Sequence, residues 1–366
     1  MALPQPRAGL MDIPLYEGGK SSLTGHDRVI KLSSNESALG PSPAATKAYG
    51  DAAAGLVRYP DGNATDLKAA ISEVHGLDPA QLICGAGSDE ILCLACRAYA
   101  GPGDEVIHTA HGFLMYGIYA RSVGATPVVV AEADLAADID AILAAVTDAT
   151  KLVFIANPNN PTGTVLPSAD LVRLRDALRE DIVLVIDGAY AEFMDGSDYD
   201  GGRALAESTP NTLMTRTFSK IYGLASLRVG WAFGPRSIIE TLERLRSPFN
   251  VNGAATAAAA AAMRDVAHTD TARDHNARWM GVAVQRLRAL GLGVTGESGN
   301  FVLPEFPNVP GKSAADADAF LQSQGMIVRR VENYGLPNYL RITLGTDEEM
   351  EAVLNALTQF MGGSDG

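Results

Sequence analysis

The chain has 366 residues, of which 47% are hydrophobic and 20% are charged, as is typical of a globular protein with one large and one smaller domain. Its 43 acidic and 29 basic residues give a formal net charge of -14, which disfavours a nucleic acid or an anionic membrane as partner. No stretch approaches the roughly 18 apolar residues of a membrane span, and the amino terminus lacks a charged segment followed by an apolar core, so we expect a cytoplasmic protein.

The first 40 residues are rich in Pro and Gly and are predicted to form an arm that joins a carboxy-terminal domain. From about residue 65 to 250, helical and β patterns alternate, which predicts a mostly parallel sheet wrapped by helices and therefore the α/β class. The predicted helices cover 65–75, 88–100, 138–146, 168–180, 237–247 and the alanine-rich segment 253–263. The predicted strands cover 106–107, 127–130, 152–156, 182–186 and 212–217.

The pattern changes after about residue 265, where a long polar helix is predicted. The elements expected in this part are a helix over 269–290, an extended segment at 300–303, a helix over 313–324, strands at 326–330 and 340–344, and a final helix from Glu348. This mixture predicts a smaller α+β domain. We therefore divide the chain into an arm (1–40), a large domain (41–265) and a small domain (266–366).

Three groups with chemical potential follow predicted strands of the large domain. Asn160, Asp187 and the pair Ser219-Lys220 each come just after such a strand. Ligands of a parallel sheet gather beyond the carboxyl ends of its strands. An amine, an acid and several hydroxyl donors at that edge are what pyridoxal phosphate requires, so we expect this cofactor.

Lys220 is the expected nucleophile, which forms a Schiff base with the cofactor aldehyde and then carries a proton. A lone lysine is more often a solvated surface charge, but this one ends an apolar strand and precedes a Gly-containing segment. Asp187 ends the run Ile182–Ile186, where a carboxylate would be largely desolvated. An ion pair between this carboxylate and a protonated ring nitrogen at about 4 Å would contribute roughly 4 kcal/mol. The alternative role of Asp187 is to cap the next turn.

Asn160 and Tyr190 are expected to donate hydrogen bonds to the phenolic oxygen of the cofactor ring. Asn160-Pro161-Thr162-Gly163 is also ordinary turn chemistry, since Pro fixes φ and Gly allows positive φ. Its place ahead of the aspartate and the tyrosine favours a cofactor site.

The phosphate is expected at the start of the helix over 88–100, where exposed backbone N–H groups bind anions. A Gly-x-Gly segment is a common turn, so this assignment depends on the other motifs. The residues assigned to the phosphate are Gly87, Ser88 and Asp89 on one side and Thr217, Ser219 and Arg228 on the other.

Phe113 is expected either to stack on the cofactor ring or to be a core aromatic residue. Arg341 alternates with apolar neighbours and is a candidate clamp for a carboxylate, with Arg329 or Arg330 as a second cation. No metal site is expected, because the histidines lack further clustered ligands.

Taken together, these motifs make the chain resemble the fold-type I pyridoxal-phosphate aminotransferases, and within them the histidinol-phosphate aminotransferase group. The resemblance covers nearly the whole length and is carried by 31–36, 58–62, the sequence NPNNPTG, 187–193, TFSK, 223–230 and LRITLG. It implies a large domain with a mostly parallel seven-stranded sheet flanked by helices, and a smaller α+β domain.

The resemblance also implies a homodimer with active sites at the interface. Tyr59 would reach the cofactor phosphate of the other subunit, although by itself it could be a turn tyrosine, and Tyr16 and Asn35 would line the substrate end. Three segments depart from the usual pattern. They are Asn35-Glu36-Ser37-Ala38, Asp187-Gly188-Ala189-Tyr190 in place of Asp-Glu-Ala-Tyr, and Tyr16 to Ser21, which lacks the commoner proline before glycine.

We expect a reversible transamination in histidine biosynthesis, between histidinol phosphate and 2-oxoglutarate. The partners would be a small-molecule amino donor and a 2-oxo acid, with Arg341 holding the carboxylate of one substrate and the phosphate of the other. An aromatic or broad-specificity aminotransferase is the alternative, since it would share every catalytic residue. A decarboxylase of the same superfamily is a further one.

Overall fold

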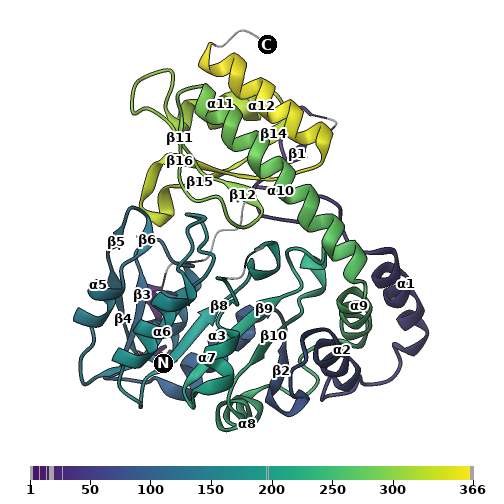
Figure 1. The fold of residues 1–366 in the computed structure, drawn as a ribbon, viewed down its shortest axis with the longest axis vertical. Coiled ribbons are helices and arrows are strands. Elements are labelled where there is room, and N and C mark those ends of the chain that lie inside the picture. Colours follow the sequence, from purple (N-terminus) through teal and green to yellow (C-terminus); the bar gives the residue numbers. More distant parts are fainter. Residues whose placement is uncertain are drawn as a thin grey trace.

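The computed structural model describes residues 3–7, 9–13, 15, 20–26, 28–194, 196 and 198–362. Its main feature is a seven-stranded sheet at the centre of the larger, lower part of the molecule (Figure 1). The strands lie in the order β2-β10-β9-β8-β7-β3-β4. They are β2 (Leu82–Gly85), β3 (Glu105–Thr109), β4 (Thr126–Val130), β7 (Thr150–Ala156), β8 (Val183–Asp187), β9 (Thr212–Thr217) and β10 (Gly230–Phe233).

All neighbouring strands of this sheet run parallel except β10, which is antiparallel to both β2 and β9. The expected α/β fold with a mostly parallel seven-stranded sheet is therefore confirmed. The strands at 82–85 and 230–233 were not among the predicted ones, because each has only four residues and includes a glycine at one end.

Helices cover both faces of the sheet, and alternate residues of each strand point to opposite faces. On β7, Leu152 and Phe154 pack with α3, α4 and α8, whereas Val153 and Ile155 pack with α5, α6 and α7. The helices of this part are α1 (Pro43–Ala52), α2 (Thr65–His75), α3 (Ser88–Tyr99), α4 (Met115–Val123), α5 (Ile139–Ala144), α6 (Ser168–Ala177), α7 (Arg203–Ser208), α8 (Arg236–Leu245) and α9 (Gly253–Arg264).

The expected helices of this part are all present, with ends that differ by up to three residues. The helix at 65–75 matches α2 at both ends. The alanine-rich α9 contacts α1 and α2, since its small side chains let the helices approach closely. No helix in the described ranges is both long and apolar enough to cross a membrane. The cytoplasmic location stays a prediction.

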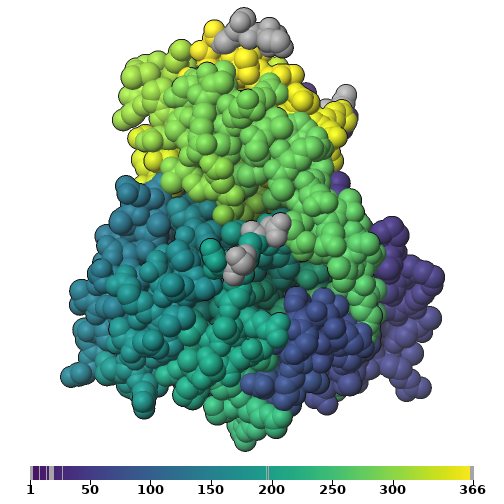
Figure 2. Space-filling model, in the orientation of Figure 1, coloured from purple at the N-terminus to yellow at the C-terminus, as the bar shows by residue number. Residues whose placement is uncertain are grey.

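The carboxy-terminal part is built around a second sheet that packs against three helices (Figure 1). Its strands are β11 (Gly293–Val294), β12 (Phe301–Val302), β13 (Pro304–Glu305), β15 (Arg329–Val331) and β16 (Leu336–Thr343), and its helices are α10 (Val266–Ala289), α11 (Ala314–Ser323) and α12 (Asp347–Met361). In Figure 2 these green and yellow segments form a continuous mass above the teal segments.

The single strand expected at 326–330 is in fact two. β14 (Met326–Ile327) pairs in parallel with β1 (Ile30–Lys31), whereas β15 pairs with β16. The arm thus contributes one strand beside the carboxy-terminal part, while Arg7 donates to the carbonyl oxygen of Ser122 near the end of α4. The division of the chain into an arm, a large domain and a small domain remains a prediction.

The remaining elements are short. β5 (Glu132–Ala133) and β6 (Ala136–Ala137) form a small hairpin. The 3-10 turns are η1 (Leu10–Asp12), η2 (Ala53–Gly55), η3 (Pro79–Gln81), η4 (Ala191–Phe193), η5 (Ala225–Leu227) and η6 (Glu332–Tyr334).

Candidate active site

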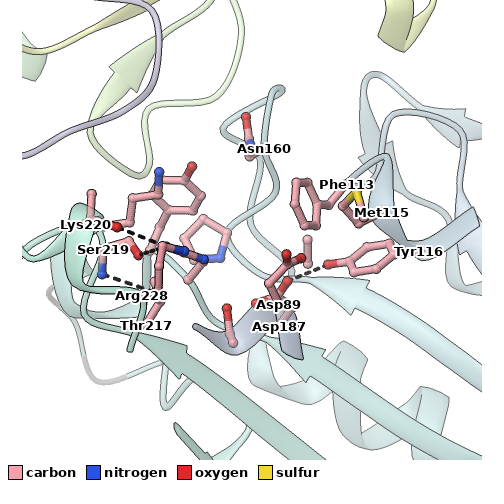
Figure 3. A pocket seen from close by; sticks show the side chains of 16 residues that line it. Asp89, Phe113, Met115, Tyr116, Asn160, Asp187, Thr217, Ser219, Lys220 and Arg228 are labelled. Atoms are coloured by element: carbon pink, nitrogen blue, oxygen red, sulfur yellow. Dashed lines mark hydrogen bonds between the residues drawn. The ribbon is translucent and has the colours of Figure 1, made fainter. Parts of the chain in front are cut away.

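A cavity of about 410 Å³ lies at the carboxyl ends of β7, β8 and β9 and reaches the first turn of α3. This volume is in the range usual for small-molecule sites. Lys220, Ser219 and Arg228 lie on one side of it, and Phe113, Met115 and Tyr116 on the other (Figure 3). The residues expected from the sequence that line it are Ser88, Asp89, Phe113, Asn160, Asp187, Tyr190, Thr217, Ser219, Lys220 and Arg228.

Lys220 lies in the loop after β9, where the strand brings it to the edge of the sheet. Its Nζ donates to the carbonyl oxygen of Ser34 at 3.1 Å and lies 5.6 Å from the centre of the Tyr190 ring. Burial, with a contribution from the positive charge of Arg341, lowers the pKa of this amine to about 7. A large fraction of the amine is therefore uncharged, and nucleophilic, near neutral pH.

Asp187 is the last residue of β8, and both of its carboxylate oxygens accept hydrogen bonds. Tyr116 donates its hydroxyl to Oδ2 at 2.8 Å (Figure 3), and Thr215 donates to Oδ1 at 3.0 Å. Burial raises the pKa of the carboxyl above its ordinary value, and the two hydrogen bonds oppose that change. Neither Tyr116 nor Thr215 could be found from the sequence, because neither belongs to a motif that points to Asp187.

Asn160 and Tyr190 connect the cavity to the arm and to β16. The Oδ1 atom of Asn160 accepts from Nη1 of Arg341 at 2.5 Å, and the hydroxyl of Tyr190 accepts from Nδ2 of Asn35 at 2.8 Å. Burial raises the pKa of Tyr190 to about 12, so its hydroxyl keeps its proton at neutral pH.

The opposite end of the cavity is a set of donors. Arg228 donates through Nη1 to Oγ of Ser219 at 3.1 Å, and its guanidinium lies against the backbone of Gly87. A Cβ at position 87 would stand 2.5 Å from Nη2 of Arg228, and φ is +82° there, so only glycine suits this position. Next to it begins α3 with Ser88, which lines the cavity. The first N–H groups of a helix have no partner within the helix and are suited to bind an anion.

Comparison with known proteins places the chain in a family. Residues 27–357 match the family described as aminotransferase class I and II. The chain belongs to this family. The match spans both sheets and includes every cavity residue named above.

Two relatives of this aminotransferase are similar over nearly their whole length. The histidinol-phosphate aminotransferase of Rhodospirillum rubrum is 58% identical over 361 residues, which are 99% of this chain and 98% of that protein. That of Dinoroseobacter shibae is 56% identical over 355 residues, 97% of each chain. Among solved structures, histidinol-phosphate aminotransferase from Sinorhizobium meliloti in complex with pyridoxal-5'-phosphate has a TM-score of 0.89 at 28% identity, covering 99% of this chain and 98% of that one.

Arg341, Arg329 and Tyr59 are not among the residues that line the cavity. Arg341 contacts Asn160 and the carbonyl oxygen of Ser33, and Arg329 lies opposite it on the neighbouring strand β15. Tyr59 is 84% exposed, away from the cavity of its own chain, and its ring stacks on Phe249. Tyr16 lies outside the described residues.

Phe113 lines the cavity and also packs edge-on against Tyr116 beside the core. Its stacking on the cofactor ring stays a prediction. Arg341 is 6% exposed, because β16 is buried on both faces at this point. Its guanidinium donates to polar groups of the arm and of Asn160.

Proposed function

We propose that this chain transfers an amino group between histidinol phosphate and 2-oxoglutarate, with pyridoxal phosphate as its cofactor. The aminotransferase activity follows from the family, and the substrate from relatives of that name that are 51–58% identical over almost the whole chain. The observation that carries the proposal is one cavity in which an amine of lowered pKa, a buried carboxylate and a cluster of anion donors all meet.

The cavity suits the cofactor at both ends. A phosphate requires a cation, a hydroxyl and N–H groups, which the guanidinium of Arg228, Oγ of Ser219 and the start of α3 supply. Gly87 has no side chain and so leaves space for the guanidinium of Arg228. At the other end, the carboxylate of Asp187 is buried and accepts bonds from neutral hydroxyls, which leaves its charge to be balanced by a cation. The protonated ring nitrogen of pyridoxal phosphate supplies that cation.

When bound, the cofactor supplies an aldehyde that takes up amino groups and a ring that withdraws electrons from the substrate's carbon. Lys220 would hold the cofactor through its Nζ and would move a proton to and from that carbon of the substrate. Its pKa of about 7 suits a base that must release and recover a proton at neutral pH. Asp187 holds the ring nitrogen protonated, and Asn160 and Tyr190 donate to the phenolic oxygen.

Arg341 is the proposed anchor for both substrates. Its guanidinium is buried, fixed by the carbonyl oxygen of Ser33 and by Asn160, and stands over the ring of Phe301 at 5.7 Å. A guanidinium matches the oxygen pair of a carboxylate or of a phosphate. Arg329, across the strand pair, adds a second positive charge that favours the dianionic phosphate.

The proposed assembly is a homodimer with Tyr59 serving the cofactor phosphate of the other subunit. The exposure of three large hydrophobic side chains supports this proposal, since Leu56, Val57 and Tyr59 are 76%, 86% and 84% exposed. A partner surface would remove this apolar area from water. Mixing a Tyr59→Ala variant with a Lys220→Ala variant under conditions of subunit exchange tests this. Sites shared between subunits predict recovered activity in the mixture, since one site of each mixed dimer then has both residues. No recovery argues against the shared site.

Steady-state kinetics test the substrate. The purified protein is supplied with 2-oxoglutarate and either histidinol phosphate or phenylalanine, and released carbon dioxide is measured in parallel. We expect histidinol phosphate to give the higher kcat/KM and no carbon dioxide to form. A preference for phenylalanine would favour the aromatic or broad-specificity alternative, and carbon dioxide release the decarboxylase.

Borohydride reduction of the native protein tests the cofactor separately. We expect mass spectrometry to find a pyridoxyl group on the peptide that carries Lys220. Its absence there would contradict the assignment of the nucleophile whatever the substrate is. Arg341→Lys keeps the charge and loses the two-pronged geometry, so we expect a raised KM for both substrates and an unchanged pyridoxyl group.

A further inference from the structure

A chain of hydrogen bonds runs from the carboxy-terminal sheet to the cavity through three buried side chains. Thr343, at the end of β16, donates through Oγ1 to Oδ1 of Asn35 at 3.0 Å. Asn35 donates through Nδ2 to the hydroxyl of Tyr190 at 2.8 Å. The exposed fractions of the three residues are 3%, 1% and 3%, so solvent does not compete for these bonds.

The donor-to-acceptor direction of these hydrogen bonds is fixed at the end that Thr343 forms. The backbone N–H of Asn35 donates to Oγ1 of Thr343 at 2.9 Å, and a backbone N–H can act only as a donor. The hydroxyl oxygen of Thr343 is therefore an acceptor in this bond, and its own proton goes to the amide oxygen of Asn35.

The amide of Asn35 could present its oxygen or its nitrogen to a given neighbour, and its two neighbours decide between them. If the amide were reversed, the nitrogen would face Thr343, whose buried hydroxyl proton would lose the acceptor that the structure gives it. The oxygen of Asn35 would then accept the proton of Tyr190. The observed orientation instead presents the nitrogen to Tyr190, so the phenol oxygen accepts a bond and its own proton is left to point elsewhere.

Asn35 is held in place by its backbone as well. Its φ is +55°, a conformation uncommon for a residue other than glycine, and Asn300 donates through Nδ2 to its carbonyl oxygen at 3.0 Å. The backbone N–H of Thr343 also donates to the carbonyl oxygen of Leu32 at 2.9 Å. The relay therefore joins two rigid parts of the molecule and does not depend on a free side chain.

We propose that Thr343 is a positioning residue: by fixing the amide of Asn35, it commits the hydroxyl proton of Tyr190 to the cavity. This inference rests on the proposed function, in which the phenolic oxygen of the cofactor accepts a hydrogen bond from that hydroxyl. Thr343 does not line the cavity itself and acts through Asn35 and Tyr190. Around Tyr190 the charged groups are Arg341, Lys220 and Asp187, none of which this relay alters.

The test is a pH titration of the visible absorbance of the cofactor-bound protein without substrate. A hydrogen bond donated to the phenolic oxygen makes that oxygen bind the chromophore's own titrating proton less tightly. Losing the donor therefore raises the pH midpoint of the absorbance titration. Thr343→Val keeps the shape and removes the hydroxyl, and we expect its midpoint to rise by about 0.4 to 1.1 units, the usual net contribution of one hydrogen bond. Thr343→Ser restores the hydroxyl and should return the midpoint to that of the natural protein.

The Tyr190→Phe background separates this relay from a general structural effect. Tyr190→Phe should raise the midpoint by itself, and adding Thr343→Val should then change it no further, because the proton to be directed is gone. Thr343→Ala removes the hydroxyl without adding volume, and it serves in place of the valine variant if that one does not fold.

Two results would overturn the inference. One is an unchanged midpoint in Thr343→Val and Thr343→Ala. The other is a shift on adding Thr343→Val that has the same size with and without the hydroxyl of Tyr190. Neither result concerns the substrate, so a failure of histidinol phosphate in the kinetic assay leaves this test intact. A natural protein that shows no visible cofactor band would instead contradict the proposed function.

Discussion

We predict that the hydrogen bond from Tyr116 to Asp187 sets the pH range in which the cavity can hold a cationic ring. Tyr116 is 1% exposed, and its ring stacks on Phe154 with centroids 4.7 Å apart. Tyr116→Phe keeps this packing and removes only the hydroxyl that donates to Oδ2 at 2.8 Å. The carboxylate then keeps the bond from Thr215 and loses half of its hydrogen-bonded stabilisation.

The size of the effect follows from the charge on the acceptor. A hydrogen bond to a charged group contributes about 1.5 to 3 kcal/mol, and one pKa unit corresponds to about 1.4 kcal/mol. Burial already raises the pKa of Asp187, so the variant should raise it further by about one to two units. The sign is that of a carboxyl whose charged form is destabilised: the negative charge is lost at a higher pH than in the natural protein.

The assay is the dissociation constant of pyridoxal phosphate for the apoprotein, measured from pH 8.5 downward. Well above both pKa values we expect similar constants, because the carboxylate is charged in both proteins. As the pH falls, the affinity of Tyr116→Phe should begin to decrease about one to two units earlier. The cofactor's own titration is common to both proteins and cancels in the comparison.

Tyr222→Phe is the matched control. Tyr222 is also fully enclosed, but its hydroxyl contacts the sulfur of Met263 at 3.7 Å, away from the cavity. We expect its affinity to decrease at the same pH as in the natural protein. If Tyr116→Phe behaved like this control, the carboxylate would not depend on the Tyr116 hydroxyl, and the reasoning would be wrong.

Two further predictions concern stability. Gly188→Ala would place a Cβ 1.8 Å from Nη1 of Arg216, so we expect a loss of at least about 1 to 3 kcal/mol in chemical denaturation, whereas Gly50→Ala in α1, with open space around it, should be neutral or stabilising. An equal effect of the two would contradict the contact. The pKa of Lys220 is about 7 in the folded protein and 10.5 in its ordinary state. Between these two pH values the unfolded apoprotein therefore binds more protons than the folded one. The free energy of unfolding should rise with pH across that range, by at most about 5 kcal/mol. Lys220→Met should lack this rise; if the two proteins kept the same pH profile, the lysine would not be desolvated.

The residues found from sequence are those that chain position alone can place. Lys220, Asp187 and Asn160 each lie at or just beyond the carboxyl end of a strand. Parallel strands end at one edge of the sheet, so the proximity of these residues follows from the fold class. Arg228 and Ser219 are close in sequence, so the turn between them suffices to bring them together. In these cases local patterns and one rule of topology were enough.

The residues missed are those whose role depends on contacts between distant segments. Tyr116 lies 71 residues before Asp187, on a helix that was not predicted, and Thr343 lies 308 residues after Asn35. Neither is distinguished by its own neighbours in the chain, since a tyrosine in a helix and a threonine in a strand are ordinary. The resemblance supplied Asn35 as a substrate residue, but its bonds to Tyr190 and Thr343 give it a second role that no motif shows.

Gly188 shows the same limit from the opposite direction. Its sequence position marks a departure from the usual pattern without giving a reason for it. In the fold, the space that a side chain would fill is taken by Arg216, which is 7% exposed and lies 3.6 Å from Oε1 of Glu192. The same guanidinium donates to the carbonyl oxygen of Thr215, whose hydroxyl holds Asp187. A side chain at 188 would therefore disturb the groups that support the carboxylate of Asp187, because of a residue 28 positions further along the chain.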